Sequence, residues 1–209
     1  LDGLLDEPFW HNVLPASGFL QQNPVEGARA SQPTDVRIAF DGAALYIGAM
    51  LHDEEPERIL AYNRRRNAFP FTDDRFIVVI DPFGDGRNGY YFEVNPAGMM
   101  TDGLVSTGQG GGLDRSWDGI WDARVARTAD GWSVEMRIPF RTMNFDAEAP
   151  SWGINFHRTI RRNHEDVLWT AHRRNQGIYQ LQNAGRLHGL QGMSQGLGLE
   201  VKPYVSASS

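Results

Sequence analysis

Short stretches in which apolar and polar residues alternate run through most of the chain, and they end at glycine, proline or aspartate. Alternation with a period of two is typical of strands that have one buried face. Two pairs of such stretches are joined by turns of the kind found in β-hairpins: 35–40 and 45–52 across Asp41-Gly42, and 121–127 and 132–138 across Ala129-Asp130-Gly131. The sequence therefore predicts two hairpins.

A nearly continuous apolar run at 76–80 predicts a strand buried on both faces. Further strands are expected at 90–94, 103–106, 152–161, 167–171 and 185–192. The other expected features are short helical segments at 7–12, 56–61 and 140–144, an irregular opening over about the first thirty residues, and a flexible loop at 108–112. About nine to eleven strands with few helices predict an all-β fold, a two-sheet antiparallel jelly-roll-like β-sandwich with a few short helices.

The length and composition fit one large all-β domain. Of the 209 residues, 41% are hydrophobic, which allows a sizeable core, and the 23 glycines and 11 prolines suit many tight turns. We expect the sandwich to occupy residues 1–195. Residues 196–209 alternate again and end without a turn, so we expect them to begin a following segment or linker and the chain to be a fragment.

Charge and residue usage exclude several classes of partner and site. The formal net charge of -6 argues against a nucleic-acid partner, because neutralising phosphates requires a basic surface. The chain contains no cysteine, so it has neither a disulfide nor a thiolate site. The sequence has no run of about eighteen apolar residues, so no transmembrane helix is expected in this chain.

Sequence signatures of catalysis are absent. The histidines show no H-E-x-x-H spacing, and neither G-x-S-x-G nor a Walker loop occurs. Adjacent carboxylates occur at Glu54-Glu55, Asp73-Asp74 and Glu165-Asp166, each at a predicted turn where solvated acidic side chains are common. The sequence favours binding over chemistry and leaves open an enzyme of the glycoside-hydrolase type.

The turn at 81–88 offers oxygen ligands for a metal ion. Asp81, Asp85 and Asn88 place two carboxylates and one amide close together, and calcium prefers such hard oxygen ligands. Aspartates in turns also accept hydrogen bonds from backbone N–H groups. A structural calcium ion held by these residues and a turn stabilised by its own aspartates are both open interpretations.

Aromatic and basic residues supply candidate binding surfaces. Trp117 and Trp121 flank Gly119, and exposed indoles on loops stack on sugar rings, although Trp121 begins a predicted strand and also fits the core. Arginines at 64–66, 158, 161–162 and 173–174 can either converge on an acidic ligand or pair with the abundant acidic residues.

Three passages resemble the family 9 carbohydrate-binding modules. They are Leu1-Asp2-Gly3-Leu4-Leu5-Asp6-Glu7-Pro8-Phe9-Trp10, the hairpin 35–53, and the stretches 74–81 and 89–95. With 131–139 and 152–156, the resemblance covers residues 1–192. The passages 87–98 and 159–162 resemble more closely a bacterial branch in which the module precedes a C-terminal outer-membrane β-barrel-like segment of unknown function, which would begin at 198–204.

The resemblance implies a β-sandwich, often with structural calcium, in a periplasmic, outer-membrane-associated or secreted bacterial protein. The function that it implies is non-catalytic binding of an oligo- or polysaccharide. The alternative is a periplasmic structural or interaction domain that packs on its own C-terminal membrane-associated segment and binds no sugar.

Members of this family hold a terminal sugar between two tryptophans, backed by a glutamate, an arginine and an asparagine. In this sequence the first tryptophan falls at Phe71, the glutamate at Ile77, the arginine at Glu93, the second tryptophan at Ile178 or Tyr179, and the asparagine near Asn175. Most of these positions differ from the family pattern. The expected ligand-binding residues are Phe71 and Tyr179 as an aromatic platform, with Glu93, Asn175, Trp117 and Trp121.

Overall fold

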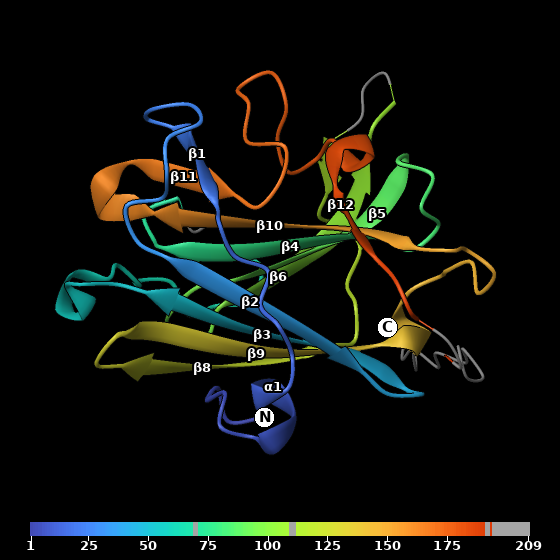
Figure 1. Cartoon of the computed structure of the whole chain (residues 1–209), viewed down its shortest axis with the longest axis horizontal. Helices are drawn as coiled ribbons and strands as arrows, with labels where there is room; N and C mark the ends of the chain where they lie inside the picture. The colour runs from blue at the N-terminus through green and yellow to red at the C-terminus, as the bar shows by residue number, and fades with distance from the viewer. Residues whose placement is uncertain (69–70, 109–111, 191–192, 194–209) are drawn as a thin grey trace, which may run out of the picture.

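The computed structural model describes residues 1–68, 71–108, 112–190 and 193. Two antiparallel sheets lie face to face and form a sandwich, with the larger sheet above the smaller one in Figure 1. The N-terminal helix α1 (Pro8–His11) lies below the smaller sheet in this view. The predicted all-β sandwich is therefore confirmed.

The larger sheet has eight strands. Seven follow the order β1-β11-β10-β4-β5-β6-β7, and β12 pairs with the start of β10 on the edge that also pairs with β11. Its central strand β4 contains the predicted apolar run and is buried from Phe76 onward. The strands are β1 (Leu20–Asn23), β4 (Arg75–Asp81), β5 (Asn88–Val94), β6 (Met100–Ser106), β7 (Gly112–Asp114), β10 (Trp152–Ile160), β11 (Glu165–Leu168) and β12 (Gly185–Leu187).

The smaller sheet has the order β2-β3-β9-β8 and contains both predicted hairpins. Its strands are β2 (Thr34–Phe40), β3 (Ala44–His52), β8 (Asp122–Thr128) and β9 (Gly131–Pro139). The Asp41 carboxylate accepts hydrogen bonds from the N–H groups of Ala43 (2.7 Å) and Ala44 (2.8 Å). These bonds fix the turn between β2 and β3, as expected of aspartate in a hairpin turn.

The remaining regular structure consists of single 3-10 turns in the connections between strands or after a strand. They are η1 (Pro56–Arg58), η2 (Phe140–Thr142), η3 (Arg161–Asn163) and η4 (Leu181–Asn183). Among the residues described, none of the helices has the length and apolar character needed to span a membrane.

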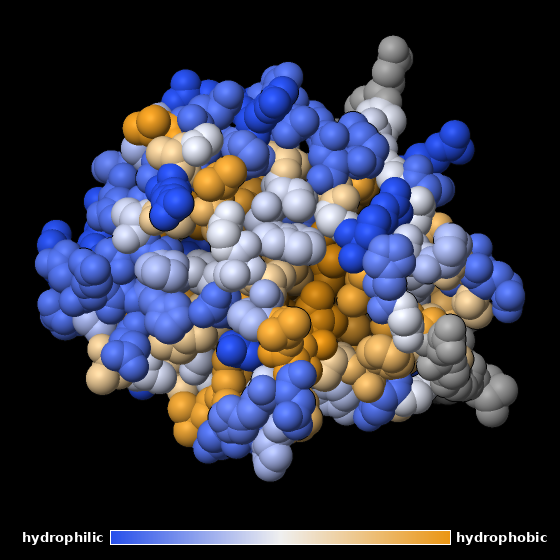
Figure 2. Space-filling model, viewed as in Figure 1, coloured by the Kyte–Doolittle hydropathy of each residue, from blue (hydrophilic) through white to orange (hydrophobic). Residues whose placement is uncertain are grey.

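The hydrophobic core fills the space between the two sheets. Phe76, Phe92 and Phe156 of the larger sheet belong to one buried cluster with Leu45 and Trp132 of the smaller sheet. Figure 2 shows hydrophobic residues in a hollow in the middle of the viewed side, with hydrophilic residues around it. A second, smaller cluster lies on the other face of the larger sheet and contains Ile77, Val79, Tyr91, Val105, Leu168, Ile178 and Leu181.

A buried ion network joins the two sheets. Arg158 of β10 is fully buried and donates hydrogen bonds to the carbonyl oxygens of His52 (2.7 Å) and Pro33 (2.9 Å). Arg162 forms a bidentate pair with Asp53, with N–O distances of 2.6 and 2.7 Å. These two arginines thus follow the second interpretation of the arginine clusters, because they pair with acidic and carbonyl groups of the fold.

Three strands differ from the sequence-based prediction. β1 forms within the predicted irregular opening, because the edge of β11 supplies hydrogen-bond partners to a stretch with little apolar alternation. β7 begins at Gly112 and pairs with β6, where the end of a flexible loop was predicted. β11 begins at Glu165, which was expected in a turn. The predicted following segment, 196–209, lies outside the described residues.

Candidate functional site

The outer face of the larger sheet carries a cluster of charged and aromatic side chains. In β4 and β5, Phe76 and Phe92 point into the core, so Arg75, Tyr91 and Glu93 lie on the opposite face. Strand pairing aligns Ile77 with Glu93 and Arg75 with Thr159 of β10. The register of three strands therefore brings these polar groups together.

Glu93 is the buried centre of this cluster. Its side chain has no exposed surface, and its Oε2 accepts a hydrogen bond of 2.8 Å from the Tyr91 hydroxyl. Arg75 Nη1 lies 3.4 Å from Glu93 Oε1, and Arg115 Nη2 lies 3.7 Å from Glu93 Oε2. One carboxylate thus holds two guanidinium groups, one from β4 and one from Arg115, the residue directly after β7.

The polar contacts continue across the sheet to β11. Arg75 Nη2 donates a hydrogen bond of 3.1 Å to Thr159 Oγ1, and the Thr159 hydroxyl donates one of 2.8 Å to Asp166. His157 Nε2 lies 3.0 Å from the same Asp166 oxygen. Burial acts to raise the pKa of Asp166, but the hydrogen bond and charge of His157 outweigh it and hold this pKa well below its usual range. Asp166 is therefore an ionised acceptor.

Tyr179 places an aromatic ring over this face. Its side chain is 39% exposed, and its ring centroid lies 6.1 Å from that of Tyr91. Burial and the Glu93 charge raise the pKa of Tyr179, so its hydroxyl keeps its proton at neutral pH. Ile178 and Leu181, on either side of it, pack in the outer cluster and anchor the segment to the sheet.

The exposure of these groups decides which of them can meet a ligand. The side chains of Arg75 and Arg115 are 16% and 24% exposed, whereas Glu93 has no exposed surface. Glu93 is therefore placed to orient the two arginines and does not itself reach the solvent. The arrangement offers hydrogen-bond donors beside an exposed tyrosine ring, which is the combination that a polyhydroxylated ring requires.

The two predicted tryptophans lie on the other side of the sheet. Trp121 is 5% exposed, and its ring meets that of Phe92 edge to face at a centroid distance of 5.0 Å. Trp117 is partly buried and packs on Tyr90, also at 5.0 Å. Phe92 and Tyr90 point into the core, so both tryptophans belong to the core and are separated by the sheet from Tyr179.

Arg66 lies beside Trp121 at the edge of the core. Its guanidinium lies 5.9 Å from the Trp121 ring, and its Nη2 lies 3.0 Å from Asp102 and 3.1 Å from Asp118. Asp102 also accepts a hydrogen bond from the Gly119 N–H. Arg66 is thus engaged within the fold, as the second interpretation of the arginine clusters expects.

The remaining predicted binding residues are exposed and lie in loops. Phe71 is 61% exposed in the turn that precedes β4. Asn175 is exposed in the segment before Tyr179, and its backbone carbonyl accepts a hydrogen bond of 3.1 Å from Gln180 Nε2. Of the predicted set, the structure brings Glu93 and Tyr179 together, and it places Trp117 and Trp121 elsewhere.

The predicted calcium ligands form a turn that is already hydrogen bonded. The buried Asp81 carboxylate accepts hydrogen bonds from the N–H groups of Phe83 (3.2 Å), Gly84 (2.8 Å) and Gly86 (2.8 Å). Asp85 and Asn88 are exposed, and Asp85 accepts a hydrogen bond from the Arg87 N–H. Asp81 directs its oxygens at backbone donors, so the donor set does not fit a calcium ion shared with the other two residues.

Sequence reasoning missed Arg75, Arg115 and Tyr91 as members of the site. For Arg75 the signal was a charged residue directly before an apolar run. For Tyr91 it was the position two residues before the charged Glu93 in an otherwise apolar strand, which places both side chains on one face. Charged side chains in such strands are almost never buried unless they are paired.

Comparisons with solved structures identify the fold. A family 9 carbohydrate-binding module from Caldicellulosiruptor kristjanssonii, solved with cellotriose, has a TM-score of 0.65 and 17% identity over 97% of this chain and 94% of its own. A structure of such a module from the same organism with glucose gives 0.62 and 17% over 94% and 93%. A protein from Bacteroides uniformis gives 0.59 and 15% over 76% and 78%.

No family model and no curated protein matches the sequence. The similarity to the solved structures is a similarity of fold at low sequence identity. The structure and the comparisons together show that this chain has the β-sandwich fold of the family 9 carbohydrate-binding modules.

Proposed function

We propose that this chain is a non-catalytic module that binds an oligo- or polysaccharide on the outer face of its larger sheet. The observation that carries the proposal is the exposed Tyr179 ring beside Arg75 and Arg115, both held by the buried Glu93. The fold supports it, because two structures with the same fold contain cellotriose and glucose.

The chemistry of the cluster suits a sugar. A pyranose ring has an apolar face that stacks on tyrosine and a rim of hydroxyls that accept hydrogen bonds from arginine.

The state of the carboxylates favours binding over hydrolysis. Glycoside hydrolysis requires an acid and a base or nucleophile that are both able to reach the sugar. Glu93 is enclosed by Tyr91 and two arginines, and Asp166 is engaged by His157 and Thr159. Neither carboxylate is arranged to transfer a proton to a glycosidic oxygen.

Isothermal titration against a panel of oligosaccharides, beginning with cellotriose, tests the proposal. We expect saturable heat with the wild-type chain and a loss of roughly tenfold or more in affinity for Tyr179→Ala, since stacking contributes on the order of 1 kcal/mol or more. Tyr46→Ala is the matched control, because Tyr46 lies on β3 of the smaller sheet and bonds Asp41.

The absence of heat across the panel from folded protein would overturn sugar binding. An unchanged affinity in Tyr179→Ala would instead overturn the assignment of the face. The first result would favour the alternative, an interaction domain that binds its own C-terminal segment, and a pull-down with that segment would then be the appropriate measurement.

Export to the periplasm, the outer membrane or the medium is part of the same proposal. It is supported by the resemblance of 87–98 and 159–162 to an envelope-associated branch of the family. Fractionation of bacterial cells that express the natural gene, followed by immunoblotting, tests this location. Recovery of all the protein with cytoplasmic markers would contradict it.

A further inference from the structure

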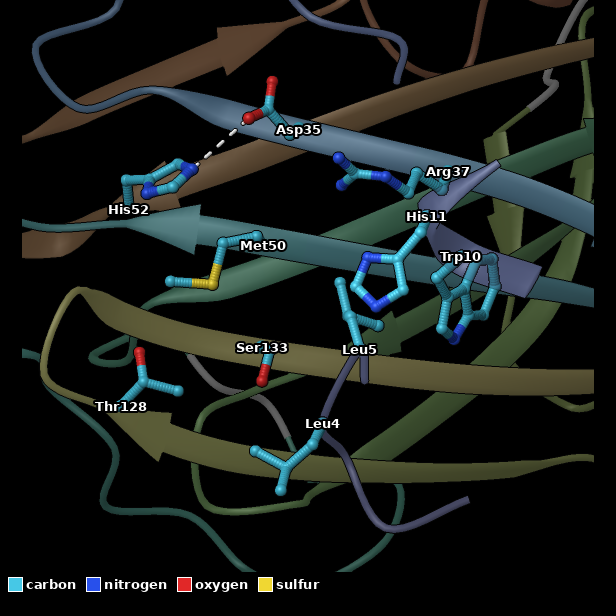
Figure 3. A pocket seen from close by; sticks show the side chains of 10 residues that line it. All are labelled: Leu4, Leu5, Trp10, His11, Asp35, Arg37, Met50, His52, Thr128 and Ser133. Atoms are coloured by element: carbon cyan, nitrogen blue, oxygen red, sulfur yellow. Dashed lines mark hydrogen bonds and ion pairs between the residues drawn. The ribbon is translucent and has the colours of Figure 1, made fainter. Parts of the chain in front are cut away.

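A pocket of about 330 Å³ lies on the outer face of the smaller sheet, on the other side of the sandwich from Glu93 and Tyr179. Its volume falls in the range of sites for small ligands. Figure 3 shows side chains from the N-terminal segment and from β2, β3 and β9 around it. The lining residues are Leu4, Leu5, Trp10, His11, Asp35, Arg37, Met50, His52, Thr128 and Ser133.

One wall of the pocket is the N-terminal segment, which is firmly attached to the sheet. The fully buried Glu135 accepts hydrogen bonds from the N–H groups of Asp2 (2.9 Å) and Gly3 (3.0 Å) and from Trp10 Nε1 (3.1 Å). A Cβ atom added to Gly48 would lie 2.7 Å from Leu5 and 3.0 Å from Trp10. The segment therefore lies directly on the sheet and leaves the pocket beside it.

The charged groups of the pocket are unevenly paired. Asp35 lies 3.3 Å from His52 Nε2, so its carboxylate already has a partner. Arg37 is partly buried and makes no ion pair or side-chain hydrogen bond with any residue that the structure describes. In Figure 3 the Arg37 side chain lies between the Asp35–His52 pair and His11. The pocket thus contains a guanidinium without a direct ion-pair partner in the part of the chain that the structure describes.

The rest of the lining is mainly apolar. Leu4, Leu5, Trp10 and Met50 supply most of it, and Figure 3 shows Met50 and Leu5 between the polar groups and β9. An apolar wall binds a hydrocarbon body by removing its surface from water. A guanidinium fork matches the two oxygens of a carboxylate.

We propose that this pocket binds a small organic monocarboxylate with an apolar body, whose carboxylate pairs with Arg37. Its hydrocarbon part packs on Leu5, Trp10 and Met50, and the exposed His11 lies at the rim. A neutral sugar fits this pocket less well, because it would place hydroxyls against Leu5 and Met50 and would bring no negative charge to Arg37. The site is separate from the proposed sugar face and does not depend on it.

Titration with 4-phenylbutyrate and with its neutral amide, 4-phenylbutanamide, tests this proposal. The two probes have nearly the same shape, so the difference in their affinities reports the carboxylate contact. We expect the acid to bind at least tenfold more tightly than the amide. We expect Arg37→Met to lower the affinity for the acid by at least tenfold, since a charge-assisted hydrogen bond is lost. The affinity for the amide should not change.

Three further variants make the test decisive. Arg37→Lys should retain the preference for the acid, whereas Arg124→Met, which removes an exposed arginine of β8 outside the pocket, should leave it unchanged. Tyr179→Ala should also leave it unchanged, because Tyr179 belongs to the other sheet face. Thermal melts verify that each variant is folded. Equal affinity for acid and amide, binding of neither, or full retention of acid binding in Arg37→Met would overturn the proposal.

Discussion

The hydroxyl of Tyr91 donates a hydrogen bond of 2.8 Å to Oε2 of Glu93, two residues along the same strand and on the same outer face. Burial, assisted by the Glu93 charge, raises the pKa of Tyr91 well above its usual value, so the hydroxyl keeps its proton and is the donor. Tyr91 thus fixes a carboxylate that in turn orients Arg75 and Arg115 toward the surface.

Glu93→Gln should weaken sugar binding even though Glu93 has no exposed surface. The amide keeps the shape of the side chain but removes the charge that holds Arg75 and Arg115, so we expect a loss of roughly tenfold in affinity and a lower melting temperature. Titration with cellotriose and thermal melting measure the two effects. Unchanged affinity in a folded variant would show that the arginines keep their positions without Glu93.

Arg158→Met should destabilise the sandwich by roughly 3–5 kcal/mol, because it removes one of the two arginine charges beside the buried Asp53 and Asp74. The change also removes the donors of two carbonyl oxygens, those of His52 and Pro33. Chemical denaturation gives the free energy of unfolding. Arg137→Met is a suitable comparison because Arg137 is only partly buried, and a similar loss there would contradict a special role for Arg158.

Asp74→Asn should change how stability depends on pH. Burial raises the pKa of Asp74 to about 6, although the Arg161 N–H and the charge of Arg158 oppose this. Between pH values near 4 and 6 the folded chain keeps a proton that the unfolded chain releases, so this group lowers the free energy of unfolding as pH rises.

The variant has no such proton to keep or release. The free energy of unfolding of Asp74→Asn minus that of the wild type should therefore increase by roughly 2–3 kcal/mol from pH 4 to pH 7. Urea unfolding of both chains at several pH values measures the difference, in which the shared contributions of other groups cancel. A difference that stays constant over this range would contradict the raised pKa.

Asp81→Asn should destabilise the turn between β4 and β5 by roughly 1–3 kcal/mol, because an amide NH₂ would replace one oxygen that accepts backbone hydrogen bonds. Since these bonds need no metal, EDTA should leave the melting temperature of the wild-type chain unchanged. Melting with EDTA and with added calcium checks this. A clear rise with calcium that disappears in Asp81→Asn would instead establish the ion at this turn.

The local sequence predicts much of the fold because its signals lie within a few residues of one another. The turn at Asp41-Gly42 and the alternation of 132–138 specify hairpins through contacts between neighbouring segments. The apolar run 76–80 likewise marks a central strand. β1 was missed because Leu20–Asn23 carries little apolar alternation and is ordered by an edge that lies far away in the sequence.

The amino-acid sequence alone determined the all-β class and both hairpins, since each depends on local backbone preferences and a period of two. Only the tertiary structure decided that Arg75, Glu93, Arg115 and Tyr179 share one face and that Trp117 and Trp121 do not. The physical reason is that strand order and register arise from pairing between distant segments, and a shift of one residue moves a side chain to the opposite face.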